Sequence, residues 1–138
     1  HCKTRRQRQM CIRDSVLVVH GDDGLDEISV TSETSISELK DMQIKEYKIS
    51  PTDFGLDFGT FEAITAQSSE ESLKMVNEAF AGTKSSIQDM IALNAGAALY
   101  IANKVTSISD GVELAFDLMN SGKAAEKLNA YVNASNNL

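Results

Sequence analysis

The chain has 138 residues, with 13 Lys and Arg against 20 Asp and Glu, and a formal net charge of −7. This length fits one domain with a sizeable core, and the acidic balance argues against broad binding to nucleic acid or to an anionic membrane, because both need a positive field. No apolar run is long enough to span a bilayer and no secretory signal pattern occurs, so we expect a soluble cytoplasmic protein.

The first segment of the chain, HCKTRRQRQMCIR, is basic and contains both cysteines. By contrast, residues 14–138 carry 8 basic and 20 acidic residues, a net charge of −12. We expect residues 1–15 to be a non-native or artefactual basic head, since the segment shows no apolar periodicity. The alternative is a basic arm for nucleic acid or targeting. Because residues 14–138 have no cysteine, a cysteine-based metal site is excluded there.

Short runs rich in β-forming residues follow between residues 16 and 50. VLVVH, EISV, SISEL and QIKEYKIS each predict a strand. DMQ, between the last two, predicts a hairpin turn that joins an antiparallel pair near a sheet edge. The first run stops at Gly21, and we expect a buried strand there that delivers the next loop to the end of the sheet where ligands bind.

The pattern becomes helical from residue 68 onward. It predicts helices over residues 68–82 and 86–104, and a third from about residue 109 with a break near Gly122. Ser68 and Glu71 have the spacing of a capping box at the first of these helices. Strands followed by separate helices predict the α/β class, as part of a layered domain.

Four acids, Asp22, Asp23, Asp26 and Glu27, gather in the loop GDDGLDE. A solvated acidic turn is the commoner explanation, and a site for a hard cation such as Mg²⁺ is the other. In a regular strand, Asp26 and Glu27 would point to opposite sides, so they share one metal ion only if Asp26 lies before the strand begins. The residues alone leave both interpretations open.

Three further features bear on function. His20 is either a base near the acidic loop or a strand-end residue that packs, and the sequence does not decide between these roles. Asn94, inside an apolar helix, is expected to hydrogen-bond a neighbouring loop and not a ligand. No glycine-rich nucleotide-binding loop occurs, and no residue gains a catalytic role from its spacing.

Three segments, in their order along the chain, resemble the carboxy-terminal part of the anthranilate phosphoribosyltransferase family. They are VVHGDDGLDEISV, EYKISPTDFGL and IQDMIALNAGAALYIANKVTSISDGVELAFDLMNSGKAAEKL. The resemblance covers residues 16–132. It implies that residues 16–138 form part of a three-layer α/β domain of the nucleoside phosphorylase and phosphoribosyltransferase type, with short strands followed by a helical segment. It also implies a homodimer when the protein is complete.

The resemblance implies a reaction as well. The 5-phosphoribosyl group would pass from phosphoribosyl diphosphate to anthranilate, releasing diphosphate, with Mg²⁺ required. Asp26 and Glu27 match the acidic pair of the family, which holds Mg²⁺ against the diphosphate leaving group.

The sequence also departs from the family pattern. The glycine-rich diphosphate loop and the anthranilate-binding loop do not occur in it, and TSETS stands where the family usually has a Gly-Pro-Thr turn. We therefore expect a fragment that does not turn over substrate alone. Two alternatives stay open: an enzyme similar to pyrimidine nucleoside phosphorylases, and a non-catalytic α/β module whose basic head binds an acidic partner.

Overall fold

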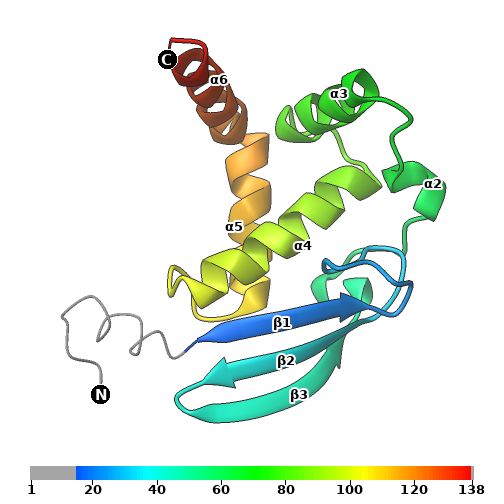
Figure 1. The fold of residues 1–138 in the computed structure, drawn as a ribbon, viewed down its shortest axis with the longest axis vertical. Coiled ribbons are helices and arrows are strands. Elements are labelled where there is room, and N and C mark those ends of the chain that lie inside the picture. The colour runs from blue at the N-terminus through cyan, green and yellow to red at the C-terminus, as the bar shows by residue number, and fades with distance from the viewer. Residues whose placement is uncertain (1–14, 138) are drawn as a thin grey trace, which may run out of the picture.

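The computed structural model describes residues 15–137, so the basic head predicted for residues 1–15 lies outside the described residues except for Ser15. Strands β1 (Val16–Gly21), β2 (Thr34–Lys40) and β3 (Gln43–Ile49) form an antiparallel sheet in the order β1-β2-β3. The helices are η1 (Pro51–Phe54), α2 (Phe61–Ile64), α3 (Ser69–Phe80), α4 (Ser86–Ile101), α5 (Ile108–Asn120) and α6 (Lys123–Ser135). Figure 1 shows α4 lying along one face of the sheet, with α5 behind it.

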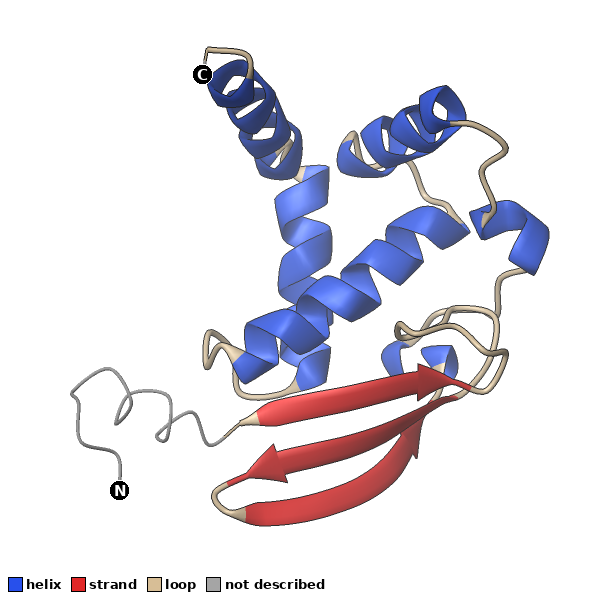
Figure 2. Ribbon diagram, in the orientation of Figure 1, coloured by secondary structure: helices blue, strands red, loops and turns tan. Residues whose placement is uncertain are grey.

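The two faces of the sheet differ in what covers them (Figure 2). On the inner face, Leu17, Val19 and Ile36 join the core formed with α4 and α5. On the outer face, Val16 and Val18 are 45% and 63% exposed. The prediction of a buried first strand is therefore wrong, because the described helices cover only one face. The α/β class is confirmed, and the described residues contain the sheet and one helical layer.

The hairpin between β2 and β3 is confirmed at the predicted place. Lys40 pairs with Gln43, so the turn consists of Asp41 and Met42 alone. Both have positive φ, 51° and 62°, as in the two-residue turns that match the twist of antiparallel strands. The antiparallel pair is thus held by a tight turn, and β3 is an edge strand among the described residues.

Serine N-caps set the starts of the three longer predicted helices. The hydroxyls of Ser68, Ser85 and Ser107 accept hydrogen bonds from the backbone N–H three residues later, at 3.1, 3.2 and 3.1 Å. Gly122, with φ of 78°, separates α5 from α6 as the sequence predicts. Within residues 15–137, none of these helices is long and apolar enough to cross a membrane.

The sequence did not predict all of the local structure correctly. Glu71 accepts the backbone N–H of Gln67 at 2.6 Å, one residue before the N-cap, so the expected reciprocal capping box at α3 is only half formed. A complete capping box occurs instead at η1, where Ser50 caps the helix and its N–H donates to Asp53 at 2.8 Å. Both η1 and α2 are single turns that the periodicity did not predict.

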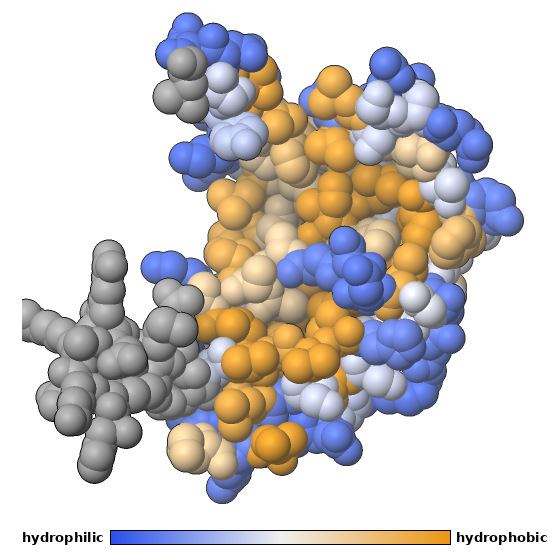
Figure 3. Space-filling view, viewed as in Figure 1, coloured by the Kyte–Doolittle hydropathy of each residue, from blue (hydrophilic) through white to orange (hydrophobic). Residues whose placement is uncertain are grey.

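The helical layer is hollowed on the side seen in Figure 3, where apolar side chains gather between α3, α4, α5 and α6. The hollow has a volume of about 410 Å³. Its larger lining side chains are Phe80, Ile91, Leu99, Leu118 and Met119. Only the last of these is fully buried, so an apolar surface remains open among the described helices.

Helices α4 and α5 cross in backbone contact at two glycines. A Cβ atom added to Gly96 would lie 2.6 Å from the backbone nitrogen of Val112, and one added to Gly111 would collide with the carbonyl oxygen of Gly96. Real Cβ atoms do not approach other atoms so closely. The crossing therefore requires both glycines and fixes the position of α4 on α5.

Replacing Gly96 by alanine tests this contact. In an open helix, Gly→Ala raises the free energy of unfolding by up to about 1 kcal/mol, whereas here overpacking should lower it by about 2 kcal/mol. Urea denaturation followed by circular dichroism measures the difference. Gly122→Ala is the control, because no atom lies within 4 Å of the new Cβ. Only the positive φ of this position opposes the change, and it should lower the free energy of unfolding by about 1 kcal/mol. A stabilised Gly96→Ala protein would show that the helices are not in tight contact.

Candidate metal site in the β1–β2 loop

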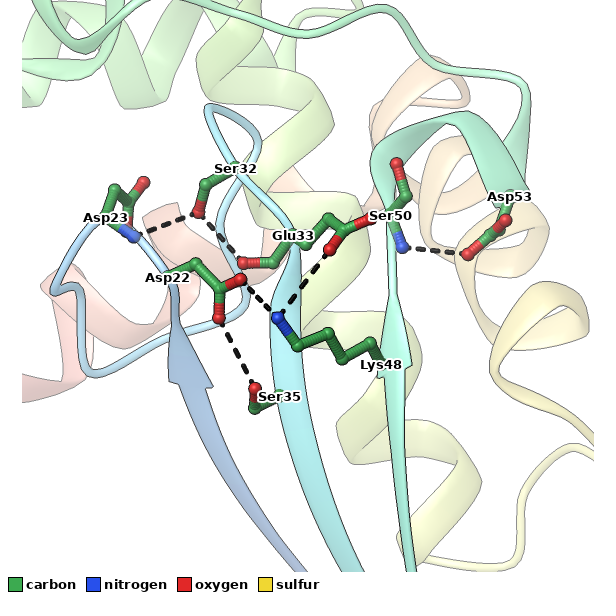
Figure 4. A network of polar contacts seen from close by, with 8 residues as sticks. All are labelled: Asp22, Asp23, Ser32, Glu33, Ser35, Lys48, Ser50 and Asp53. Carbon is green, nitrogen blue, oxygen red and sulfur yellow. Dashed lines mark hydrogen bonds and ion pairs between the residues drawn. The ribbon is translucent and has the colours of Figure 1, made fainter.

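The loop between β1 and β2, residues 22–33, holds the four acids in two different environments. Asp22 is ion-paired: its carboxylate lies 2.6 Å from the Nζ atom of Lys48 on β3. Lys48 also lies 3.7 Å from the carboxylate of Glu33 at the other end of the loop (Figure 4). The hydrogen bond from Lys48 lowers the pKa of Asp22, and the same contact raises the pKa of Lys48. Lys48 thus ties both ends of the loop to the sheet.

Asp23 is held inside the loop by hydroxyl groups. Its carboxylate accepts a hydrogen bond from Ser29 at 2.6 Å, a second from Thr31, and a third from the N–H of Leu25 at 3.1 Å. Partial burial by itself would raise the pKa of Asp23. These hydrogen bonds have the larger, opposite effect and lower the pKa to about 2. Gly21 leaves room for this arrangement, since a Cβ there would lie 2.5 Å from the Asp23 carboxylate. Asp23 therefore has a structural role.

Asp23→Asn should destabilise the folded chain at neutral pH. A carboxyl whose pKa is lowered by folding stabilises the protein above its unfolded pKa of 3.8, and that stability is lost as the pH falls toward 2. Allowing for solvent screening of an exposed carboxylate, we expect a loss of about 1 kcal/mol at pH 7. Urea denaturation at pH 7, 4 and 2 measures it.

In Asp23→Asn, the stability should also change less between pH 4 and pH 2 than in the unsubstituted chain, because the titrating group is gone. The exposed Asp57 provides a matched control, and Asp57→Asn should stay within about 0.5 kcal/mol of the unsubstituted chain. Equal pH profiles for the chain and for Asp23→Asn would contradict the role of this carboxylate.

Asp26 and Glu27 lie in a bend and are exposed. Among the described residues, no ion pair and no side-chain hydrogen bond engages either carboxylate. The strand predicted for EISV does not form, and residues 26–30 are irregular. Strand alternation therefore does not force these two side chains to opposite sides, which removes the sequence-based objection to a shared metal ion.

The donor chemistry of this pair fits Mg²⁺. Within residues 15–137, no three His, Cys, Asp or Glu side chains converge as a cluster that holds a metal by itself. Mg²⁺ takes one or two carboxylates, keeps several waters and completes its shell with substrate phosphate oxygens. Two unengaged carboxylates at an exposed bend meet that requirement, whereas a structural zinc or calcium site needs more protein ligands.

The segment after the acidic pair is anchored by Asn94 of α4. The backbone N–H of Ile28 donates to the Asn94 Oδ1 atom at 3.0 Å, and the Nδ2 atom donates to the Ile28 carbonyl at 2.9 Å. Nδ2 also donates to the carbonyl of Met90 at 3.0 Å. The prediction that Asn94 hydrogen-bonds a neighbouring loop is confirmed. The sequence did not indicate which loop, because the two groups are 66 residues apart.

Among the described residues, His20 takes no part in the hydrogen-bond networks of the acidic loop. It is exposed on β1, on the same face as Val16 and Val18, and opposite Ser35 in the sheet. Among the described residues, its ring makes no hydrogen bond to a loop carboxylate. The structure thus gives no geometry that assigns a base to this position.

A second polar network, which the sequence did not indicate, lies at the other end of the sheet. The buried carboxylate of Glu38 accepts hydrogen bonds from the hydroxyls of Tyr100 at 2.6 Å and Tyr47 at 3.0 Å. Lys40 donates to the Tyr100 hydroxyl at 3.0 Å. Burial and the neighbouring Glu38 raise the pKa of Tyr47. The hydroxyl of Tyr100 thus joins α4 to β2.

Comparison with known proteins identifies the class. A model of the glycosyl transferase family, a/b domain, matches residues 7–125, and the chain belongs to this family. Within it, the chain is similar to anthranilate phosphoribosyltransferases: it is 44% identical over 119 residues to that of Halorhodospira halophila and 47% identical over 117 residues to that of Alkalilimnicola ehrlichii. These alignments cover 86% and 85% of this chain but 35% of each relative. The resemblance inferred from the sequence is confirmed, and the chain spans about a third of the length of these relatives.

Solved structures agree with this assignment. The anthranilate phosphoribosyltransferase of Thermus thermophilus matches 91% of this chain with a TM-score of 0.78 and 31% identity, over 37% of its own chain. The enzyme of Saccharomyces cerevisiae, solved in complex with phosphoribosyl diphosphate (PRPP) and Mg, has a TM-score of 0.79. That match covers 90% of this chain and 36% of the yeast chain at 21% identity, and therefore shows the fold alone.

Proposed function

We propose that this chain is the metal-holding part of an anthranilate phosphoribosyltransferase, which transfers the 5-phosphoribosyl group of PRPP to anthranilate and releases diphosphate. The observation that carries the proposal is the division among the four acids of residues 22–27. Asp22 and Asp23 are engaged within the loop, while Asp26 and Glu27 have no partner among the described residues. The pair left available is the pair that matches the acidic motif of the family.

In this proposal, Asp26 and Glu27 hold Mg²⁺, which when bound neutralises charge on the diphosphate leaving group. The other loop residues keep the pair in place: Lys48 fixes the base of the loop through Asp22, and Ser29 fixes its interior through Asp23. No residue of the described chain is assigned as a general base. Binding of PRPP and anthranilate is assigned to the complete enzyme, of which the chain spans about a third.

The relatives support the transferase over the other candidate functions. Those quoted above carry the name anthranilate phosphoribosyltransferase at 44% and 47% identity, which favours it over a nucleoside phosphorylase within the same fold. The alternative of a non-catalytic module depends on the basic head, which lies outside the described residues. Inactivity of the chain alone, a homodimeric complete enzyme and a cytoplasmic location stay predictions.

A chimaeric enzyme tests the proposed function. Residues 16–138 would replace the corresponding segment of the Halorhodospira halophila enzyme, and consumption of anthranilate would be followed by fluorescence with PRPP and Mg²⁺. We expect Mg²⁺-dependent activity. Asp26→Asn or Glu27→Gln in the chimaera should lower kcat/KM about a hundredfold, because the metal then lacks a ligand near the developing charge.

The matched control is Asp41→Asn, which removes an exposed carboxylate from the β2–β3 turn and should leave kcat/KM unchanged within about twofold. Asparagine also tolerates the positive φ of this position. A folded chimaera without activity would contradict the proposed function. Full activity in the Asp26 and Glu27 variants would contradict the assignment of the metal ligands.

A further inference from the structure

The acidic pair lies between two anchored residues, although its own side chains are exposed. On one side, the N–H of Leu25 donates to Asp23 at 3.1 Å, and its carbonyl accepts the N–H of Gly21 at 2.9 Å. On the other side, both backbone polar groups of Ile28 bond to the amide of Asn94. Asp26 and Glu27 are therefore a two-residue bridge between fixed points, and their backbone has little freedom.

The two anchors differ in origin. The Leu25 anchor comes from nearby residues of the same segment, Asp23 in the loop and Gly21 at the end of β1. The Ile28 anchor comes from the middle of α4, and Ile28 is buried with 2% of its surface exposed. Asn94 therefore provides the link between the acidic pair and a rigid helix of the core.

The amide of Asn94 can serve this link in one orientation only. Its Nδ2 atom donates to two carbonyls, those of Ile28 and Met90, so Oδ1 must face the Ile28 N–H. The side chain thereby replaces the neighbouring strand that EISV lacks, accepting one hydrogen bond from Ile28 and donating one to it. An aspartate at this position would lose the donor, and an alanine would lose both bonds.

We propose that Asn94 is a positioning residue for the metal pair: through Ile28 it fixes Glu27, and with it Asp26, in the geometry that Mg²⁺ requires. The inference rests on the proposed function, in which Asp26 and Glu27 hold the metal. Asn94 contacts neither carboxylate, and it acts by holding the backbone next to them. Removing a hydrogen bond made directly to a metal ligand typically weakens metal binding about 10- to 100-fold, and we expect the lower end of that range for a bond to the adjacent backbone.

The test uses Mn²⁺ as a paramagnetic probe on the 138-residue chain. Bound Mn²⁺ broadens the backbone amide NMR signals of nearby residues and reports even weak binding, and added Mg²⁺ should reverse the broadening. In the unsubstituted chain we expect broadening centred on residues 25–28, and in the double variant Asp26→Asn, Glu27→Gln we expect none. Asn94→Ala should raise the Kd for Mn²⁺ about tenfold.

Gln88→Ala is the matched control. Gln88 is another side-chain amide of α4, and it donates to the carbonyl of Ala79 at 3.3 Å and to the side chain of Asn120 at 3.2 Å, away from the acidic loop. This variant should lose stability yet keep the Mn²⁺ affinity of the unsubstituted chain. Where Asn94→Ala does not fold, Asn94→Leu serves in its place, since it preserves the approximate side-chain size and removes the hydrogen bonds to Ile28 without adding a charge.

Three outcomes would overturn the inference. Unchanged Mn²⁺ affinity in a folded Asn94 variant would show that the anchor does not position the pair, while the metal role of Asp26 and Glu27 would stand. An equal loss in Gln88→Ala would assign the effect to general loosening of α4. Absence of Mn²⁺ binding to the unsubstituted chain would show that this chain does not form the metal site by itself. The chimaeric enzyme would then test the proposed function independently.

Discussion

Helix α4 rests on α5 through a contact between two glycines, and the rest of the structure depends on it. At Gly96 and Gly111 no side chain separates the two backbones. The close approach buries Leu93, Ala97 and Val112 in one continuous core. Because α4 is fixed on α5 in this way, it can act as a rigid support for the sheet and for the acidic loop.

Polar groups of α4 connect to the sheet and to the loop at two places. Near its end, Tyr100 donates to the buried carboxylate of Glu38 on β2 at 2.6 Å. In its middle, the Asn94 amide holds both polar groups of Ile28. Burying a carboxylate or a backbone amide costs free energy unless hydrogen bonds replace those to water. Both connections therefore specify one arrangement of sheet, loop and helix.

The sequence predicted the features that depend on neighbouring residues in the chain. The cap at Ser68, the break at Gly122 and the hairpin at Asp41 follow from local hydrogen bonding and backbone conformation. The strand predicted for EISV does not form, and the reason is not local. The backbone polar groups of Ile28 bond to the side chain of Asn94, 66 residues away, and not to a neighbouring strand. The acidic pair could be proposed as a metal site from its resemblance to a family. The sequence could not show that Asp22 and Asp23 have partners while this pair has none among the described residues, because those partners come together only in the folded loop.

The charges of the loop explain why the four acids of residues 22–27 are not equivalent. Four carboxylates within six residues repel one another, and the fold of the loop reduces this repulsion by giving two of them protein partners. The ammonium group of Lys48 offsets the charge of Asp22, and hydroxyl donors stabilise that of Asp23. A divalent cation then meets only two carboxylates that have no protein partner among the described residues. In the proposed site, the ion is directed to Asp26 and Glu27 because the neighbouring acids are already engaged.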